Sequence, residues 1–151
     1  MFLHASSASR ASWALQGLTE ARTRLKQLVL ECLAMFGLPL DRVALAGFSQ
    51  GAMTAMDLAL SLEGPVAGVA MLSGAPIVVE EWAKALEKRP KGLRVFISHG
   101  QSDMVLPFAA SGWSRDLLAK GGAHVEFHPH GGGHDLGNGT LPKLVEFWAS
   151  L

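Results

Sequence analysis

The feature that most constrains the fold is a regular alternation of short apolar runs with longer segments of helical periodicity. The runs predict strands at 43–47, 66–72, 93–98 and 124–128. The segments around them predict helices at 15–36, 50–62, 80–88, 108–120 and 141–151. Right-handed crossovers between such elements predict an α/β fold, with αβα layers around a mostly parallel sheet of about four strands.

The first predicted strand, 43–47, contains only apolar residues and does not alternate with polar ones. This pattern is typical of a strand that is covered on both faces of a parallel sheet. The chain of 151 residues is long enough to bury a core without disulfides or metals, and no linker or repeat interrupts the alternation. We therefore expect one domain over residues 1–151.

The charge balance excludes some classes of partner. Thirteen basic residues balance thirteen acidic ones, so there is no electrostatic basis for binding nucleic acid or an anionic membrane surface. No apolar run approaches the ~20 residues of a membrane span, and the first ten residues do not have the pattern of a secretory signal. Cys32 is the only cysteine, which favours a reducing compartment and a small buried residue in the first helix. We expect a cytoplasmic protein that acts on a small molecule.

The sequence Gly47-Phe48-Ser49-Gln50-Gly51 lies between a predicted strand and a predicted helix. A G-x-S-x-G motif in this context indicates a nucleophile elbow, in which a sharp turn exposes the serine hydroxyl above the sheet. The backbone N–H of Gln50, at the start of the helix, would then donate to a developing oxyanion. Without this context the motif is equally compatible with an ordinary turn.

A serine needs a base and an orienting acid to become a nucleophile. Functional groups of parallel sheets gather beyond the carboxyl ends of the strands. The loop after 93–98 contains Asp103 as its only carboxylate, and the loop after 124–128 contains His134 behind three glycines. The chain order Ser49, Asp103, His134 is the order found in α/β-hydrolases.

Three blocks, GLPLDRVALAGFSQGA, SHGQSDMVLP and HPHGGGHDL, are similar to blocks of the carboxylesterase/phospholipase family of α/β-hydrolases, which includes acyl-protein thioesterases. The resemblance runs from about residue 15 to the C-terminus. It implies that Ser49 is the nucleophile, Asp103 the acid and His134 the general base of an esterase that forms an acyl-enzyme. It implies no cofactor and no metal.

Members of this family are longer at the N-terminus, where the first strands and the loop with the second oxyanion donor lie. Here only Phe2-Leu3-His4 resembles the family's strand end, and Ala5 replaces its glycine. We therefore expect a truncated α/β-hydrolase fold with 43–47 as an unpaired edge strand, which favours a homodimer. A missing oxyanion donor typically lowers turnover by ~10² to 10³, unless residues 4–7 or a partner chain replace it.

The likeness leaves two functions open. The first is a serine hydrolase that cleaves carboxylic esters or thioesters of short to medium acyl chains. The alternative is a catalytically impaired hydrolase remnant that acts as a binding or assembly module. For the first, apolar residues in loops after strands are the candidates for substrate binding, and they include Ile77, Met104 and Leu106.

Several of these residues have other interpretations. Asp103 would also suit a turn, hydrogen-bonding its own backbone. Asp135 is a rival for the acid, although it is an immediate neighbour of His134. His128, His130 and His134 have the spacing of a metal cluster, but this requires a strand that continues through Pro129, and we expect it to end earlier. For His99 we expect a hydrogen-bonded structural role.

Overall fold

The computed structural model describes the backbone of residues 7–151 and the side chains of residues 17–151. Within this part of the chain, parallel strands form one sheet in the order β1-β2-β3-β4. The strands are β1 (Ala44–Phe48), β2 (Gly68–Leu72), β3 (Arg94–Gly100) and β4 (His124–His130). The helices are α1 (Ser7–Phe36), α2 (Gln50–Ser61), α3 (Val79–Lys88), α4 (Phe108–Lys120) and α5 (Thr140–Ala149), with a short 3₁₀ helix, η1 (Leu40–Arg42).

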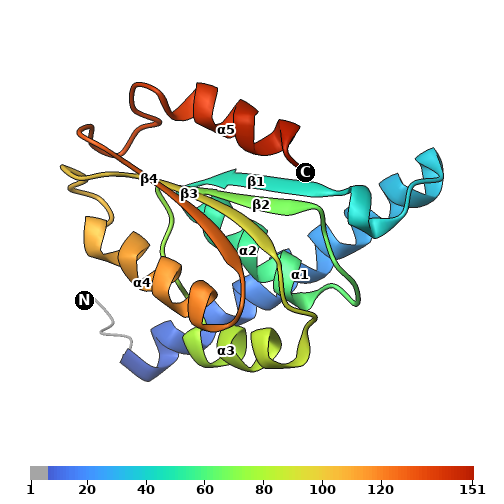
Figure 1. The fold of residues 1–151 in the computed structure, drawn as a ribbon. Coiled ribbons are helices and arrows are strands. Elements are labelled where there is room, and N and C mark those ends of the chain that lie inside the picture. Colours follow the sequence, from blue (N-terminus) through green and yellow to red (C-terminus); the bar gives the residue numbers. More distant parts are fainter. Residues whose placement is uncertain (1–6) are drawn as a thin grey trace.

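The helices lie on both faces of this sheet (Figure 1). On one face α2 packs against β1 and β2, and α4 packs against β3 and β4; α3 contacts both helices, and α1 packs on α2. On the other face α5 packs against β3 and β4. Crossovers of one hand place all connecting helices on the same face, which leaves the opposite face to the helix after the last strand. The predicted α/β fold with αβα layers is confirmed.

The core lies around the two central strands. Every residue of β2 is buried, and all of β3 after Arg94 is buried as well. Met71 and Ile97 point toward α2 and α4 and belong to the larger apolar cluster. Ala70 and Phe96 face the other way and pack with Phe147 of α5. Because side chains alternate between the faces of a strand, β2 and β3 supply both clusters.

A buried ion pair joins α1 to the rest of the domain. Arg22 donates from Nε and Nη2 to the Asp57 carboxylate at 2.6 and 3.0 Å, and the indole N–H of Trp82 donates to the same carboxylate at 3.0 Å. The Asp57 side chain is only 3% exposed. A charge at this depth is tolerated because its partners satisfy it. The contacts bring α1, α2 and α3 together beneath the sheet.

β1 is an edge strand of the described sheet, because its pairing partner there is β2 alone. Its burial alternates, with Ala44, Ala46 and Phe48 exposed. The expectation that this strand is covered on both faces is therefore wrong, whereas β2 fits it. The reason is that α5 packs mainly against β3 and β4. The predicted unpaired edge is confirmed for residues 7–151.

Two further expectations are wrong. Cys32 is exposed rather than buried, and Phe36 is also exposed, because the last turns of α1 extend beyond α2 (Figure 1). β4 does not end at His128 but continues through Pro129 to His130. Proline is accepted there because β4 is the other edge of the described sheet, where a missing N–H leaves no ladder bond unmade.

Across residues 7–151, no helix has the length and apolar character needed to cross a membrane.

Candidate active site

Ser49 lies on the turn between β1 and α2 in a conformation that serine seldom adopts. Its φ is 54° and its ψ is −121°, and its N–H donates to the carbonyl of Leu72 at the end of β2, at 2.8 Å. Such a backbone costs roughly 1 to 3 kcal/mol and persists only where its surroundings hold it. The turn therefore has the strained geometry of a nucleophile elbow.

The two glycines of the motif have different roles. A Cβ on Gly47 would overlap the backbone carbonyl of Gly51, so the close approach of β1 to the first turn of α2 requires glycine at 47. A Cβ on Gly51 would meet nothing within 4 Å. Steric crowding at the turn thus requires glycine at position 47 and not at position 51.

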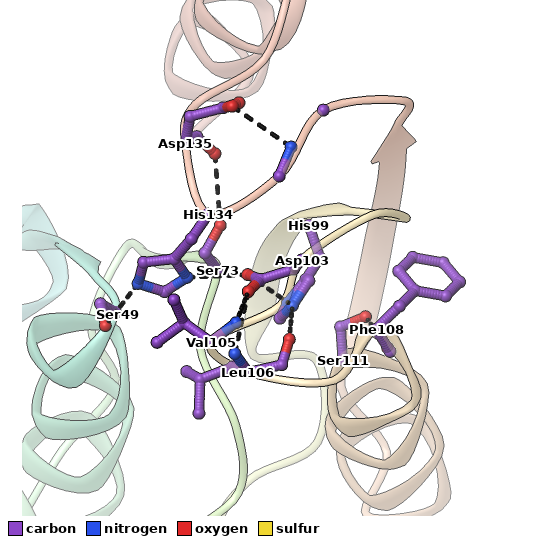
Figure 2. A network of polar contacts seen from close by, with 12 residues as sticks. Ser49, Ser73, His99, Asp103, Val105, Leu106, Phe108, Ser111, His134 and Asp135 are labelled. Atoms are coloured by element: carbon purple, nitrogen blue, oxygen red, sulfur yellow. Dashed lines mark hydrogen bonds and ion pairs between the residues drawn. The ribbon is translucent and has the colours of Figure 1, made fainter.

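A chain of hydrogen bonds connects Ser49, His134 and Asp103 (Figure 2). His134 Nε2 lies 2.9 Å from Ser49 Oγ, and His134 Nδ1 lies 2.7 Å from Asp103 Oδ2. The carboxylate can only accept, so Nδ1 carries the ring proton and Nε2 is free to accept from the serine hydroxyl. The three side chains come from the loops after β1, β4 and β3, at the carboxyl ends of the strands.

Asp103 satisfies both interpretations of its sequence context. One oxygen, Oδ1, accepts the backbone N–H groups of Val105 and Leu106, both at 2.8 Å, and forms the turn. The other, Oδ2, accepts from His134. Burial is the largest single influence on the Asp103 pKa and would raise it, but the bonds from His134, Leu106 and Val105 together outweigh burial and lower the pKa. Asp103 is thus held as a carboxylate.

The loop that carries His134 is fixed by its neighbours rather than by its glycines alone. The N–H of Ser102 donates to the carbonyl of Gly132 at 3.0 Å. Asp135 accepts the N–H groups of Gly133 and Gly137 at 3.2 and 2.7 Å, so its carboxylate orders this loop. The acid that bonds to His134 is Asp103, not the adjacent Asp135.

Phe48 is a contact of His134 that we did not single out in the sequence. Its ring centroid lies 4.9 Å from that of the imidazole, at an interplanar angle of 53°. Phe48 is the residue before Ser49 and the last of β1, so it is placed beside the triad by the same turn. Its position within the G-x-S-x-G motif is the signal that could have revealed it.

Gln50 is the first residue of α2, directly after Ser49. The first N–H groups of a helix have no partner within the helix, so this N–H is available to an anion beside Ser49. Residues 2–5, which resemble the family's strand end, lie outside the described residues, as does the rest of the chain before Ser7. The Gln50 role stays a prediction.

The predicted substrate-binding residues lie in two loops, Ile77 after β2 and Met104 and Leu106 after β3. Met104 is 95% exposed and Leu106 is half-buried, with its N–H bonded to Asp103. Ile77 lies in a depression of about 370 Å³ that is otherwise lined by residues 78–81 at the start of α3 and contains no triad residue. These assignments stay predictions.

His128 and His130 stand on one face of β4, because the strand continues through Pro129. His130 Nδ1 accepts the N–H of Gly132 at 3.2 Å, and His134 is bonded to Ser49 and Asp103. In the part of the chain that the structure describes, no three His, Cys, Asp or Glu side chains are grouped so that they could hold a metal ion.

A comparison with protein families decides the relationship. Residues 5–151 match the model of the Phospholipase/Carboxylesterase family. The chain belongs to this family. The likeness inferred from the three sequence blocks is therefore confirmed, and the parallel sheet with helices on both faces is the α/β-hydrolase fold of its structural neighbours.

Relatives in this phospholipase/carboxylesterase family include fungal proteins. Acyl-protein thioesterase 1 of Debaryomyces hansenii is 29% identical over 135 residues, which cover 88% of this chain and 58% of that protein. Acyl-protein thioesterase 1 of Neurospora crassa is 32% identical over 114 residues, which cover 74% of this chain and 46% of that protein. The chain thus spans about half the length of these relatives.

Solved structures share the arrangement. Esterase PE8 superimposes with a TM-score of 0.83 at 25% identity, covering 99% of this chain and 67% of that chain. The carboxylesterase from Mesorhizobium loti superimposes with a TM-score of 0.73 at 24% identity, covering 90% of this chain and 63% of that chain. At 24% identity, the similarity to the Mesorhizobium loti carboxylesterase shows the fold alone.

Proposed function

We propose that this chain is a serine hydrolase that cleaves carboxylic esters or thioesters of short to medium acyl chains through an acyl-enzyme on Ser49. The observation that carries the proposal is the hydrogen-bonded chain from Ser49 Oγ through His134 to Asp103. Family membership supports it, and so do the relatives named acyl-protein thioesterase 1 and the similar esterase PE8. Those relatives are longer proteins, so their activities enter here only as support.

In the proposed mechanism, Ser49 Oγ attacks the carbonyl carbon of the substrate while its proton passes to His134 Nε2. Asp103 keeps the proton on Nδ1 and stabilises the imidazolium that forms. The imidazolium then protonates the departing alcohol or thiol, and the acyl group remains on Ser49. Water, deprotonated by the same imidazole, attacks this acyl-enzyme and releases the acid.

The negative charge of each tetrahedral intermediate develops on the former carbonyl oxygen. The N–H of Gln50, at the start of α2, is the proposed donor to that oxygen. If it acts alone, turnover falls by ~10² to 10³ relative to a site with two donors. We propose that residues 4–7 or a partner chain supply the second donor.

The surroundings of Ser49 support an acyl substrate whose chain stays near the surface. Phe48 is 39% exposed beside His134, and Met104 and Val105 are exposed on the loop after Asp103. These side chains offer apolar contacts to a short or medium acyl chain rather than a closed tunnel. We propose Met104, Leu106 and Ile77 as its contacts, together with Phe48.

The second candidate function is a binding or assembly module. It is favoured by the exposed residues and open edge of β1, since an unpaired edge strand is a site for pairing with another chain. We propose that two copies of the chain, each a single domain, associate at this edge or face. Light scattering at micromolar concentration measures the mass in solution, and a monodisperse monomer contradicts the homodimer.

We also propose a cytoplasmic location. The observation that supports it is Cys32, the only cysteine in the chain, whose thiol is exposed on α1. A reducing compartment keeps such a thiol free. Secretion studies with a tagged chain test this, and a mature protein recovered outside the cell contradicts it.

Labelling with a fluorophosphonate probe tests the hydrolase proposal without knowledge of the substrate. We expect one adduct by intact mass on the wild type, and none on Ser49→Ala or His134→Ala. Ser102→Ala is the matched control, because Ser102 is an exposed serine whose hydroxyl has only a long contact of 3.5 Å to Gly131. No adduct on a folded wild type overturns the hydrolase proposal and favours the binding module.

A further inference from the structure

His99 is a buried histidine beside the triad that the proposed mechanism does not use. It belongs to β3, is 0% exposed, and its ring lies edge-on to Phe108 of α4 with centroids 6.1 Å apart. Its Nε2 lies 3.0 Å from the carbonyl oxygen of Leu106 and 3.2 Å from Asp103 Oδ2 (Figure 2). A buried polar ring at this distance from a catalytic carboxylate requires an explanation beyond packing.

The direction of these bonds follows from the partners. The carbonyl oxygen of Leu106 only accepts, so His99 Nε2 carries a proton and donates it to Leu106, while Asp103 Oδ2 lies 3.2 Å from the same nitrogen, within ion-pair distance. The other nitrogen, Nδ1, is buried and has no hydrogen-bond partner among the described residues. A proton there would be unsatisfied. The neutral ring with its proton on Nε2 is the form that fits.

Three hydrogen bonds hold both oxygens of the Asp103 carboxylate. Oδ1 accepts from Val105 and Leu106, and Oδ2 accepts from His134 and is approached by His99. These bonds hold the plane of the carboxylate, and the polar Nε2–H of His99 beside Oδ2 adds an electrostatic attraction. His99 also binds the carbonyl of Leu106, whose N–H holds Oδ1, and this ties the loop back to β3.

We propose that His99 is a positioning residue: its Nε2–H, bonded to the Leu106 carbonyl and 3.2 Å from Asp103 Oδ2, holds the carboxylate so that Oδ2 faces His134 Nδ1. The proposal rests on the proposed hydrolase function, in which Asp103 orients the base. His99 contacts neither Ser49 nor His134 in the bonds described above, so it acts through Asp103. The titratable groups that contact Asp103 among the described residues are His99 from β3 and His134 from the loop after β4. Phe108, which packs on His99 from α4, carries no charge.

Removing this donor has two consequences. The carboxylate is less firmly oriented, so kcat falls while KM, which depends on substrate contacts, changes little. Oδ2 also becomes a stronger acceptor for His134, which stabilises the protonated imidazole and moves the acid limb of the kcat/KM profile to higher pH. A residue that only filled space would produce neither the pH shift nor the separation of kcat from KM.

Three substitutions at His99 separate the donor from the volume. His99→Leu removes the donor and leaves an apolar side chain of similar reach. His99→Gln keeps an N–H near the position of Nε2, whereas His99→Asn is polar but too short to reach Asp103. For His99→Leu and His99→Asn we expect kcat to fall about 10-fold, the upper end of the effect of losing one neutral hydrogen bond. For His99→Gln we expect activity within about 3-fold of wild type, a partial rescue on the same scale.

Kinetics with an activated ester, from pH 5 to 9, and thermal unfolding of each variant make up the activity experiment. If His99→Leu does not fold, the comparison of His99→Gln with His99→Asn still decides, because both are polar amides. Equal kcat and an unchanged acid limb in these two folded variants overturn the positioning role.

A second measurement separates this proposal from the hydrolase function. The proton between His134 Nδ1 and Asp103 is observed by NMR of protein labelled with ¹⁵N-histidine, and His134→Ala assigns its resonance. We expect the resonance to move or broaden in His99→Asn and to persist in His99→Gln, even if the wild type hydrolyses nothing. If the wild type hydrolyses nothing but the resonance changes in His99→Asn and persists in His99→Gln, the hydrolase function is refuted and the positioning contact is upheld. A resonance identical in all variants overturns the positioning contact.

Discussion

The substitution Asp103→Asn tests how the acid controls the base. The amide can point its oxygen at Val105 and Leu106 or at His134. In the second orientation two part-buried backbone N–H groups, now 2.8 Å from Oδ1, would face an amide NH₂ and lose their acceptor, at a cost of about 1 kcal/mol or more each. In the first orientation only the 3.2 Å approach of His99 is lost, and Leu106 still accepts from that ring. We therefore expect the amide nitrogen to face His134.

That orientation changes the tautomer of His134. An N–H at 2.7 Å from Nδ1 makes Nδ1 the acceptor and moves the ring proton to Nε2, which can then no longer accept from Ser49. The equivalent change in serine proteases lowers kcat by about 10⁴, or roughly 5.5 kcal/mol of barrier. We expect a loss of the same order here, with an unchanged fold.

The assay is the rate of fluorophosphonate labelling, followed by intact mass, together with kcat on an activated ester. Asp116→Asn is the matched control, because Asp116 is exposed and pairs with Arg115 on α4, away from the triad. The control should label at the wild-type rate. A folded Asp103→Asn variant that keeps more than a tenth of the wild-type rate refutes the tautomer reasoning.

Three further predictions concern the fold around the site. Gly47→Ala should abolish labelling and lower the melting temperature, because a Cβ at position 47 would overlap the backbone of Gly51. Gly51→Ala should leave labelling and melting temperature near wild type, and equal effects of the two substitutions contradict this. Asp57→Asn should lower the free energy of unfolding by about 2 kcal/mol, because it leaves Trp82 and the partly exposed Arg22 with a weaker acceptor. Urea unfolding measures this loss, and a loss no larger than that of Asp116→Asn contradicts the prediction. Because the folded-state pKa of Asp103 is lowered, its contribution to stability is present above the ordinary carboxyl value of about 4 and is lost as pH falls through the lower folded value. The difference in unfolding free energy between the wild type and Asp103→Asn should therefore be constant from pH 7 to about 5 and shrink toward pH 3; no change over that range contradicts the lowered pKa.

The order of elements was predictable because periodicity reports which faces are buried, and that signal is local. The meeting of Ser49, Asp103 and His134 followed from topology, since the carboxyl ends of parallel strands share one edge of the sheet. Each of the three loops offered a residue of the required type. For this reason the site could be predicted before any geometry was available.

Other features depend on what lies beside an element, which periodicity does not report. The run at 43–47 is apolar on both faces, yet Ala44, Ala46 and Phe48 of β1 are exposed because α5 packs mainly against β3 and β4. Cys32 fits the helical stripe but lies where α1 extends beyond α2. Pro129 is compatible with β4 only because that strand is at an edge, and edge position is a property of the whole sheet.

The most direct test of the central claim is to trap the acyl-enzyme. The protein is mixed with p-nitrophenyl acetate, quenched in acid within the first turnover, digested and mapped by tandem mass spectrometry. We expect one acetyl group on the peptide that contains Ser49, absent in Ser49→Ala and much reduced in His134→Ala. Release of p-nitrophenol with acetyl on another residue, or an equal yield of adduct in His134→Ala, contradicts it.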